Sequence, residues 1–325
     1  MIDRRAALAA FAGFLTGGSV YAQGDEAADY PSRPVTVLAP FAAGGTVDIV
    51  ARLLGHKLGA ELKQPFIVEN RSGAGGTIAT GMLARAAPDG YTLMLHHMGL
   101  AFNDALYKLP FDTRRDIVPV AYVGTTPNVL VVTNKLPVHT VAEFLAYARS
   151  HPAAINYGSG GLGSAGHLPM EVLQADTGVR LTHVPYKGSG PAITDLVGGQ
   201  IQAMLLTIPA VMPFLRSGKL RAIATSGLKR SPALPDLPTI DESTVHGFDY
   251  SPWYGFFAPR RTPAPVVAKL HGAINAVLQE PAVAAVLGKQ GLEVHPLTRE
   301  QFVSVVNHDI SAWGQTIRKL AIHIG

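Results

Sequence analysis

The stretch from residue 35 to residue 52 constrains the fold of this chain more than any other. It reads as a β-branched strand at 35–39, a loop at 40–45 that ends in two glycines, and an apolar-periodic helix from Thr46. Glycines at a helix start let free N–H groups and the positive end of the helix dipole face one spot. Such a spot suits an anion, although the same pattern also serves as a plain strand-to-helix turn.

Strands and helices continue to alternate after this stretch. We expect strands at 66–69 and 91–96, a helix at 76–86, and a second glycine-rich turn at 70–76. Short loops and helices between strands are typical of right-handed βαβ units in a mainly parallel sheet. Two glycine-rich turns at the carboxyl ends of neighbouring strands would form one rim of a crevice. For the second turn, a purely conformational role stays open.

A second α/β series begins at Thr140, whose spacing to Glu143 predicts a capping box and a helix that runs to residue 150. The β-rich run at 250–258 predicts a strand that returns to the first lobe. Further strands are expected at 118–123, 129–133, 155–157, 181–185, 201–207 and 220–225. A helix is expected to end at Gly178, a second one to begin near Pro191, and others to lie at 265–278, 281–289 and 299–319.

This order of elements predicts two lobes. Lobe 1 comprises residues 30–124 and 250–325, and lobe 2 comprises residues 125–249. The helix-rich tail has no sheet of its own, so it must cover the first lobe or bridge both lobes.

Residues 1–22 carry the pattern of a secretory signal. The pair Arg4-Arg5 precedes an apolar run at 6–15 and small residues that end at Ala22, so we expect cleavage after Ala22 and export. An N-terminal membrane anchor would need a longer uninterrupted apolar span. The arginine pair also fits a twin-arginine signal, so the choice between that route and the general secretory route stays open.

The composition excludes several classes of protein. A chain of 325 residues with 47% hydrophobic and 15% charged residues is long and apolar enough for two compact α/β units. It has no cysteine, which removes disulfides, thiolate catalysis, cysteine-ligated metals and a lipid anchor on an N-terminal cysteine. A formal net charge of +4 without a Lys/Arg run is poor evidence for a nucleic-acid partner, and we expect none.

The glycine-serine loop at 158–167 is the most distinctive local feature. Its G-x-G-x-x-G spacing at 161–166 spells a dinucleotide fingerprint, but such a site also needs an acidic residue about 20 positions later, and 182–186 contains none. The hydroxyls of Ser159 and Ser164, together with backbone amides, could instead hold a carboxylate. A plain turn is the third interpretation.

The sequence gives little support for a catalytic site or a metal-binding site. The residues around Ser164 lack the first glycine of a nucleophile elbow, because Leu162 stands there. His96 and His97 are adjacent, so on a strand they point to opposite faces and cannot easily bind one ion. One of the two could face the crevice as a donor, and which one stays open. Lys187 lies beside a glycine turn and could attract an acid, although it could equally be an exposed surface lysine.

Three other residues have interpretations that are mainly structural. Asp48, in the first turn of its helix, interacts favourably with the helix dipole. Trp253, beside the returning strand, is expected in core or hinge packing rather than as a stacking platform. His167 stands at a helix start, where a local cap and a ligand contact are equally good interpretations.

Motifs along nearly the whole chain after residue 30 closely resemble the Bug solute receptors of tripartite tricarboxylate transporters. They include P-F-A-A-G-G-T-V-D-I-V-A-R, V-E-N-R-S-G-A-G-G, Y-G-S-G-G-L-G-S-A-G-H-L, V-P-Y-K-G-S-G-P and W-Y-G-F-F-A-P-R-R-T-P. The resemblance implies a periplasmic binding protein of type II-like α/β fold, with a mainly parallel sheet flanked by helices in each lobe. Such a receptor closes on a small carboxylate in the cleft between its lobes and catalyses no reaction.

The resemblance also implies ligand contacts from both lobes. Together with the candidate donors above, the predicted ligand-binding residues are Phe41, Ala42, Gly44, Gly45, His97, Ser159, Gly160, Gly163, Ser164, His167 and Lys187. Many relatives carry an aspartate where this chain has Leu206, so an amino-acid ligand is less expected. Relatives more often have small hydroxyl residues in place of His96-His97, so a differently shaped or aromatic acid is a candidate.

We therefore expect a monomeric periplasmic receptor for a di- or tricarboxylate or an aromatic acid. Its partners would be the integral membrane subunits of a tripartite transporter or a sensor kinase, with neither cofactor nor metal. An exported nucleotide-dependent α/β oxidoreductase is the alternative, because of the glycine spacing at 161–166.

Overall fold

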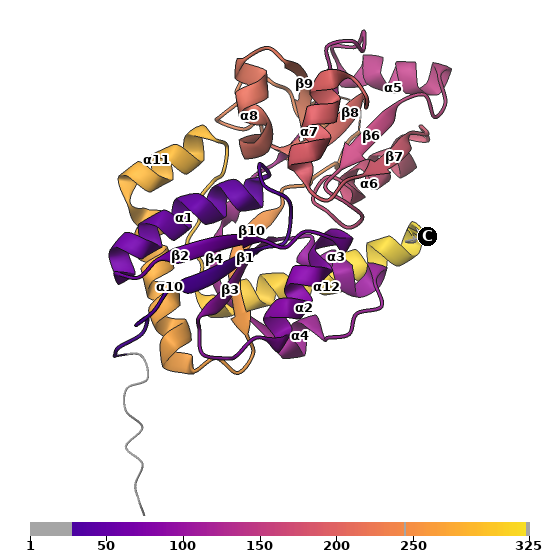
Figure 1. The fold of residues 1–325 in the computed structure, drawn as a ribbon. Helices are drawn as coiled ribbons and strands as arrows, with labels where there is room; N and C mark the ends of the chain where they lie inside the picture. Colours follow the sequence, from indigo (N-terminus) through magenta and orange to yellow (C-terminus); the bar gives the residue numbers. More distant parts are fainter. Residues whose placement is uncertain (1–27, 244, 323–325) are drawn as a thin grey trace, which may run out of the picture.

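The computed structural model describes residues 28–243 and 245–322. Within them the chain forms two α/β lobes, each built on a five-stranded sheet with helices packed against it (Figure 1). The predicted two-lobed α/β architecture is therefore confirmed. The predicted signal at 1–22, with its cleavage site, lies outside the described residues.

The first sheet has the strand order β2-β1-β3-β10-β4. β1 pairs in parallel with β2 and β3, whereas β10 runs antiparallel to β3 and β4. The sheet is thus mixed, with β10 running against the other four strands, and the predicted return of the strand at 250–258 to this lobe is confirmed. The strands are β1 (Val35–Ala39), β2 (Phe66–Asn70), β3 (Thr92–His97), β4 (Ile117–Thr125) and β10 (Trp253–Pro259).

The second sheet repeats this plan with the order β7-β6-β8-β5-β9. β6 pairs in parallel with β7 and β8, and β5 is the antiparallel strand between β8 and β9. β5 and β8 are buried along their whole length, so they are runs of apolar residues without alternation. The strands are β5 (Asn128–Thr133), β6 (Asn156–Ser159), β7 (Thr182–Pro185), β8 (Ala203–Thr207) and β9 (Leu220–Thr225).

The chain passes between the sheets twice, after β4 and after β9, and the two crossings are joined by hydrogen bonds. Ser226 accepts from the Asn128 N–H at its Oγ (2.8 Å) and donates its own N–H to the Asn128 carbonyl (2.8 Å). Tyr250 then donates its N–H to the Ser226 carbonyl (2.7 Å). These bonds hold the two connections between the lobes side by side, so a hinge motion of the lobes would move both connections together. The exact limits 30–124 with 250–325 and 125–249 stay a prediction.

Helices fill the connections between strands. Those before β5 and after β10 are α1 (Thr46–Leu62), the 3₁₀ turn η1 (Ala74–Gly76), α2 (Thr77–Arg85), α3 (Leu100–Leu106), α4 (Thr113–Asp116), α10 (Ala264–Gln279), α11 (Pro281–Lys289) and α12 (Arg299–Lys319). Those between β5 and β10 are α5 (Val141–Ser150), α6 (Leu168–Thr177), α7 (Ser189–Gly198), α8 (Ile208–Arg216) and α9 (Ile240–Ser243).

Sequence patterns do not reveal α8, because its two prolines read as helix breakers. Pro209 occupies the first turn, where no N–H is needed, but Pro213 lies inside the helix. The helix forms nevertheless because its side chains at Ile208, Val211 and Met212 are buried against the second lobe. Burial of an apolar face here outweighs a poor intrinsic propensity.

The C-terminal tail packs on the first lobe and also reaches the second, because Arg216 of α8 donates to the Lys289 carbonyl at the end of α11 (3.3 Å). α12 packs against α3 and β4, and its Phe302 contacts the Trp253 ring edge to face. Trp253 is buried and donates its indole N–H to Asp309 Oδ2 (2.7 Å), so its predicted role in core packing is confirmed. In the described ranges no single helix has the length and apolarity of a membrane span; α10 and α11 reach them only together, across a bend of 71°.

Candidate functional site

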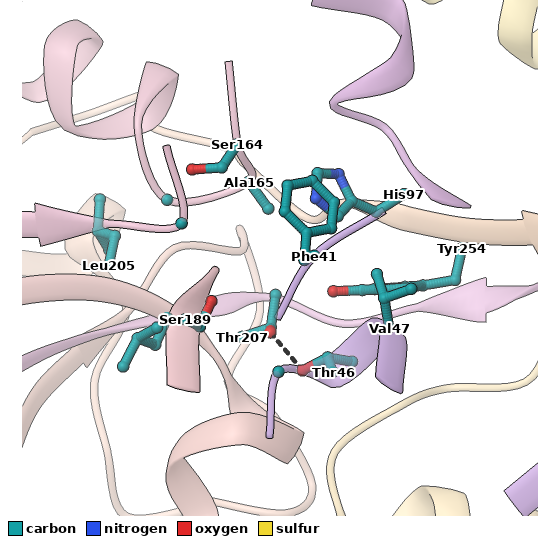
Figure 2. A pocket seen from close by; sticks show the side chains of 14 residues that line it. Phe41, Thr46, Val47, His97, Ser164, Ala165, Ser189, Leu205, Thr207 and Tyr254 are labelled. Atoms are coloured by element: carbon teal, nitrogen blue, oxygen red, sulfur yellow. Dashed lines mark hydrogen bonds between the residues drawn. The ribbon is translucent and has the colours of Figure 1, made fainter. Parts of the chain in front are cut away.

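A small, partly open cavity of about 30 Å³ lies between the two lobes, where β1, β3, β6 and β8 end (Figure 2). Its first-lobe lining consists of Phe41, Gly45, Thr46, Val47, His97 and Tyr254. Its second-lobe lining consists of Gly160, Ser164, Ala165, Gly166, Ser189, Leu205, Leu206 and Thr207. The carboxyl ends of strands in both sheets therefore converge on one site, as expected for this class of fold.

Three helices start at this cavity. Thr46 and Ser189 are the first residues of α1 and α7, and Thr207 is the N-cap of α8. The first turn of a helix has backbone N–H groups without an internal partner and the positive end of the dipole. In the part of the chain that the structure describes, neither a lysine nor an arginine lines the cavity. The site thus offers partial positive charge without a cation.

Hydroxyl groups from both lobes meet at the cavity. Thr46 Oγ1 and Thr207 Oγ1 lie 2.6 Å apart across the lobe boundary (Figure 2). The buried Tyr254 hydroxyl lies beside them: burial raises its pKa to about 12, although hydrogen bonding with Thr207 and Thr46 acts in the opposite direction. Tyr254 therefore stays neutral and can donate a hydrogen bond at physiological pH.

The Ser164 hydroxyl is the second-lobe group that is most available to a ligand. The side chain is buried, and its Oγ has no hydrogen-bond partner among the described residues. A buried hydroxyl without a partner costs folding free energy, so proteins rarely keep one without a use for it. An acceptor atom of a ligand in the cavity would satisfy it.

His97, and not His96, faces the cavity. Its Nδ1 accepts a hydrogen bond from the Gly99 N–H (2.7 Å), and its ring stacks on Phe41 with centroids 4.8 Å apart (Figure 2). Burial and the neighbouring His96 hold the pKa of His97 well below its usual 6.5. His96 is fully buried behind Phe41, and burial lowers its pKa to about 4. Both imidazoles are therefore neutral.

In the first-lobe loop, two backbone N–H groups that were predicted to bind the ligand are already bonded to other groups of the protein. The Ala42 N–H donates to the Lys187 carbonyl across the lobe boundary (3.0 Å), and the Gly44 N–H donates to Asp48 Oδ2 (3.1 Å). Asp48 also accepts from Arg52 Nε (2.9 Å) and Asn70 Nδ2 (3.0 Å). Burial acts to raise the pKa of Asp48, but these hydrogen bonds outweigh it and hold the pKa below 3.8. The structural role predicted for Asp48 is confirmed.

The second-lobe loop is held by a stack of neutral rings. Ser159 Oγ lies 2.7 Å from His183 Nε2, and the His183 ring stacks between Tyr157 (4.7 Å) and His167 (4.4 Å). The Gly163 N–H donates to His167 Nδ1 (3.2 Å). Burial lowers the pKa of His183 to about 4 and that of His167 to about 3, the latter with a contribution from His183. These side chains position the loop and do not line the cavity.

Some predicted ligand-binding residues thus line the cavity, and others do not. Those that line it are Phe41, Gly45, His97, Gly160 and Ser164. Those that lie away from its surface are Ala42, Gly44, Ser159, Gly163, His167 and Lys187, the last with an exposed side chain. Whether any of them contacts a ligand stays a prediction.

Several lining residues were not predicted from the sequence. Ser189 opens α7 shortly after β7, and Thr207 ends β8 and caps α8, so the strand-end argument applied to the first loop could have found them. Tyr254 carries no local signal, because its position depends on β10 returning to the first sheet between β3 and β4.

Glycines allow the lobes to meet around the cavity. A Cβ atom on Gly190 would lie 2.2 Å from the Ala43 carbonyl oxygen, and one on Gly75 would lie 2.2 Å from the Leu162 carbonyl oxygen. In both pairs the two residues belong to different lobes, so backbone faces backbone across the boundary. These glycines serve closure of the lobes rather than the binding of an anion.

The described residues form no candidate metal-binding site. Within residues 28–243 and 245–322, no three His, Asp or Glu side chains gather in a way that could hold a metal ion.

Comparisons of the sequence with a family model and with known proteins point to the same family. The model of the tripartite tricarboxylate transporter family receptor matches residues 50–322. Protein BugT of Bordetella pertussis is 38% identical over 293 residues, which cover 89% of this chain and 90% of BugT. A UPF0065 protein from the tcbD-tcbE intergenic region of Pseudomonas sp. strain P51 is 35% identical over 318 residues, covering 97% of this chain and 94% of that protein.

Solved structures with the same fold include two proteins with a bound acid. The structure of R. palustris Rpa4515 with adipate has a TM-score of 0.88 and 36% identity, covering 91% of this chain and 99% of that one. MatC from Rhodopseudomonas palustris with bound malate has a TM-score of 0.84 and 36% identity, covering 89% of this chain and 100% of that one. The periplasmic binding protein BugD has a TM-score of 0.88 and 37% identity, covering 90% of this chain and 99% of that one.

Proposed function

The chain belongs to the tripartite tricarboxylate transporter receptor family, and we propose that it captures a di- or tricarboxylate or an aromatic acid between its lobes for such a transporter. Members of this family are periplasmic solute-binding receptors and not enzymes, so the oxidoreductase alternative is wrong. The G-x-G-x-x-G spacing belongs instead to the loop between β6 and α6, whose Gly166 lines the cavity.

The observation that carries the proposal is the chemistry of the cavity. Three helix starts, the hydroxyls of Thr46 and Thr207, and the unpartnered Ser164 hydroxyl converge where no lysine or arginine of the described chain is present. Such a set of donors suits a carboxylate, because N–H and O–H groups satisfy its oxygens and helix dipoles favour its charge. Adipate and malate in two related structures support this class of ligand.

Binding requires movement of the lobes. The cavity of about 30 Å³ has room for about two water molecules, which is less than an organic acid needs. An acid therefore enters and leaves when the lobes separate. Because it contacts both lobes only when they close around it, the acid shifts the population toward the closed form.

Calorimetry and thermal unfolding of the mature protein with a panel of organic acids test the proposal. At least one di-, tri- or aromatic carboxylate should raise the unfolding temperature, since a ligand that binds only the folded state stabilises it. Absence of stabilisation by every acid in a broad panel would contradict it. Dialysis with NAD and NADP serves as the negative control, because the receptor is expected to bind neither.

Ser164→Ala provides the residue-level test. Loss of a buried hydrogen bond to the ligand should weaken binding by about 1–3 kcal/mol. The free protein should be as stable as wild type or slightly more stable, because the variant removes a buried hydroxyl that has no partner among the described residues. Unchanged affinity in calorimetry would show that the second-lobe contact is wrongly assigned.

The proposal also covers where the receptor acts and to which partner it delivers the captured acid. We infer that the receptor is exported through its N-terminal signal, acts as a monomer and delivers the acid to integral membrane subunits; delivery to a sensor kinase is the other candidate. Deleting the genes of the membrane subunits should abolish uptake of the bound acid. If uptake continues while an acid-dependent transcriptional response is lost in a receptor deletion, the sensor role is favoured.

A further inference from the structure

We infer that His97 is a specificity-determining residue, which donates a hydrogen bond from Nε2 to a second acceptor group of the bound acid while Ser164 holds the acid from the other lobe. The inference rests on the proposed function, because it names the class of acid that the same cavity selects. That class is a carboxylic acid with a second carboxylate or carbonyl acceptor and no cationic group.

The tautomer of His97 follows from its neighbour. The Gly99 N–H points at Nδ1 from 2.7 Å, so Nδ1 must act as an acceptor and cannot carry a proton. A neutral imidazole then carries its proton on Nε2. Nε2 has no hydrogen-bond partner in the described part of the chain, and the side chain lines the cavity. His97 therefore presents an unused donor to the ligand.

The ring is held in this orientation by its surroundings. It stacks on Phe41 with an interplanar angle of 12°, and Tyr254 packs against it edge to face with centroids 6.0 Å apart. Rotation of the ring by 180° would lose the hydrogen bond from Gly99. A donor whose orientation is fixed before binding discriminates between ligands better than a mobile one, because little ordering is required on binding.

The charge of His97 sets the selectivity. The titratable groups that face it are His96 on β3 and Tyr254 on β10, and both are neutral, so no described carboxylate favours an imidazolium. A neutral N–H donor accepts a carboxylate, carbonyl or hydroxyl oxygen but has no lone pair to offer an ammonium group. Leu205 and Leu206 on the facing wall add no acceptor for an ammonium group either. The lining formed by the described residues contains no carboxylate, so an amino acid would find no countercharge for its ammonium group in the cavity.

The two unused donors come from opposite lobes. Ser164 Oγ belongs to the loop before α6, and His97 belongs to the end of β3. Because each donor belongs to a different lobe and the lobes separate when an acid enters, we place the two acceptors at opposite ends of the ligand. A monocarboxylate with an apolar tail satisfies one donor and leaves the other unpaired, which costs binding free energy.

Matched pairs of acids test the inference by calorimetry. Adipate and hexanoate have the same chain length, and glutarate and glutamate differ by the amino group. Wild type should bind the diacid of each pair about tenfold or more tightly. In His97→Phe, which keeps a ring for Phe41, the preference for adipate over hexanoate should fall to about twofold or less. His97→Gln retains an N–H donor and should keep part of the preference. His56→Phe, a substitution of an exposed histidine on α1, is the matched control and should leave it unchanged.

The outcomes distinguish a failure of the proposed function from a failure of the inference about His97. If wild type binds none of these acids or the wider panel, the proposed function itself fails. If acids bind but His97→Phe preserves the preference for adipate over hexanoate, the inference is overturned and the proposed function stands. Imidazole ¹⁵N NMR of wild type needs no variant: His97 should show a protonated Nε2 and an unprotonated Nδ1, with and without adipate. An imidazolium pattern, or an Nε2 resonance that adipate does not shift, would also overturn the inference.

Discussion

The two glycine-rich loops that face each other across the cavity are held in place by different chemistry. The first-lobe loop is fixed by a charged group, since Asp48 binds the Gly44 N–H, Arg52 and Asn70 together. The second-lobe loop is fixed by neutral rings, since His183 binds Ser159 and stacks on His167. The difference teaches that two glycine-rich loops on the same cavity can be held in place either by an ionised side chain or by neutral rings.

In both loops, most of the donors that were predicted to bind the ligand form hydrogen bonds with other groups of the protein. The predicted donors at Gly44, Ser159 and Gly163 all bond within their own lobe. What remains for a ligand lies at the helix starts, at Ser164 and at His97. A glycine-serine loop therefore builds the wall of the cavity, while the residues that follow the loop provide its binding groups.

The largest expected effect is that of Gly190→Ala, which tests whether the loops must touch. The new methyl group would lie 2.2 Å from the Ala43 carbonyl oxygen, so the lobes cannot close as they do here. Overpacking of this kind costs about 3 kcal/mol, and we expect a loss of about 100-fold in affinity for the bound acid, measured by calorimetry.

A matched control exists on the same helix. A Cβ atom on Gly198 has no heavy atom within 4 Å, so Gly198→Ala should leave affinity unchanged. Equal affinity in both variants would show that contact between Gly190 and the first-lobe loop is not needed for binding.

Asp48→Asn tests the charged anchor of the first-lobe loop. Hydrogen bonds to an ionised group contribute more than neutral ones, so we expect a loss of about 2 kcal/mol in the free energy of unfolding, measured in urea. Because the pKa of Asp48 in the folded protein is lowered below 3.8, its contribution is full above pH 3.8 and disappears as the pH falls through the folded value. Asp89→Asn, in a more exposed ion pair with Arg33, should change stability by less than about 0.5 kcal/mol.

His183→Gln tests the neutral anchor of the second-lobe loop and should cost about 1 kcal/mol near neutral pH. Burial lowers the pKa of His183 from 6.5 to about 4. Between these values the unfolded chain binds a proton that the folded chain does not, so the free energy of unfolding falls as the pH falls from 6.5 to 4. Urea unfolding across this range should show that the free energy of unfolding falls less steeply with falling pH in His183→Gln than in wild type. An unchanged slope would mean that His183 does not titrate as its burial implies.

Lys187→Ala should have the smallest effect. The Lys187 carbonyl, and not its exposed side chain, accepts the hydrogen bond from Ala42. We expect the affinity for the bound acid to change by about twofold or less at physiological salt, since exposed charges act weakly through water. A tenfold loss in calorimetry would instead place the ammonium group at the ligand.

Much of the fold could be predicted because it depends on local patterns. The strand at Val35–Ala39 and the helices Pro281–Lys289 and Arg299–Lys319 begin and end where hydrophobic periodicity, proline and capping residues place them. α8 escaped prediction because burial of its apolar face, and not its propensity, stabilises it.

The sequence alone determined that two α/β lobes carry glycine-rich loops at strand ends, and it identified Phe41, Gly45, His97, Gly160 and Ser164, which line the cavity, within a longer set of candidates that also included Lys187. Only the tertiary structure decided which donors are free, because an N–H such as that of Ala42 is occupied by the Lys187 carbonyl of the other lobe. It also brought Tyr254 to the cavity and set Thr46 against Thr207, since those contacts arise from strand order and from the meeting of two lobes. Local patterns act within a few residues, whereas such a site is made by elements that are distant in the chain.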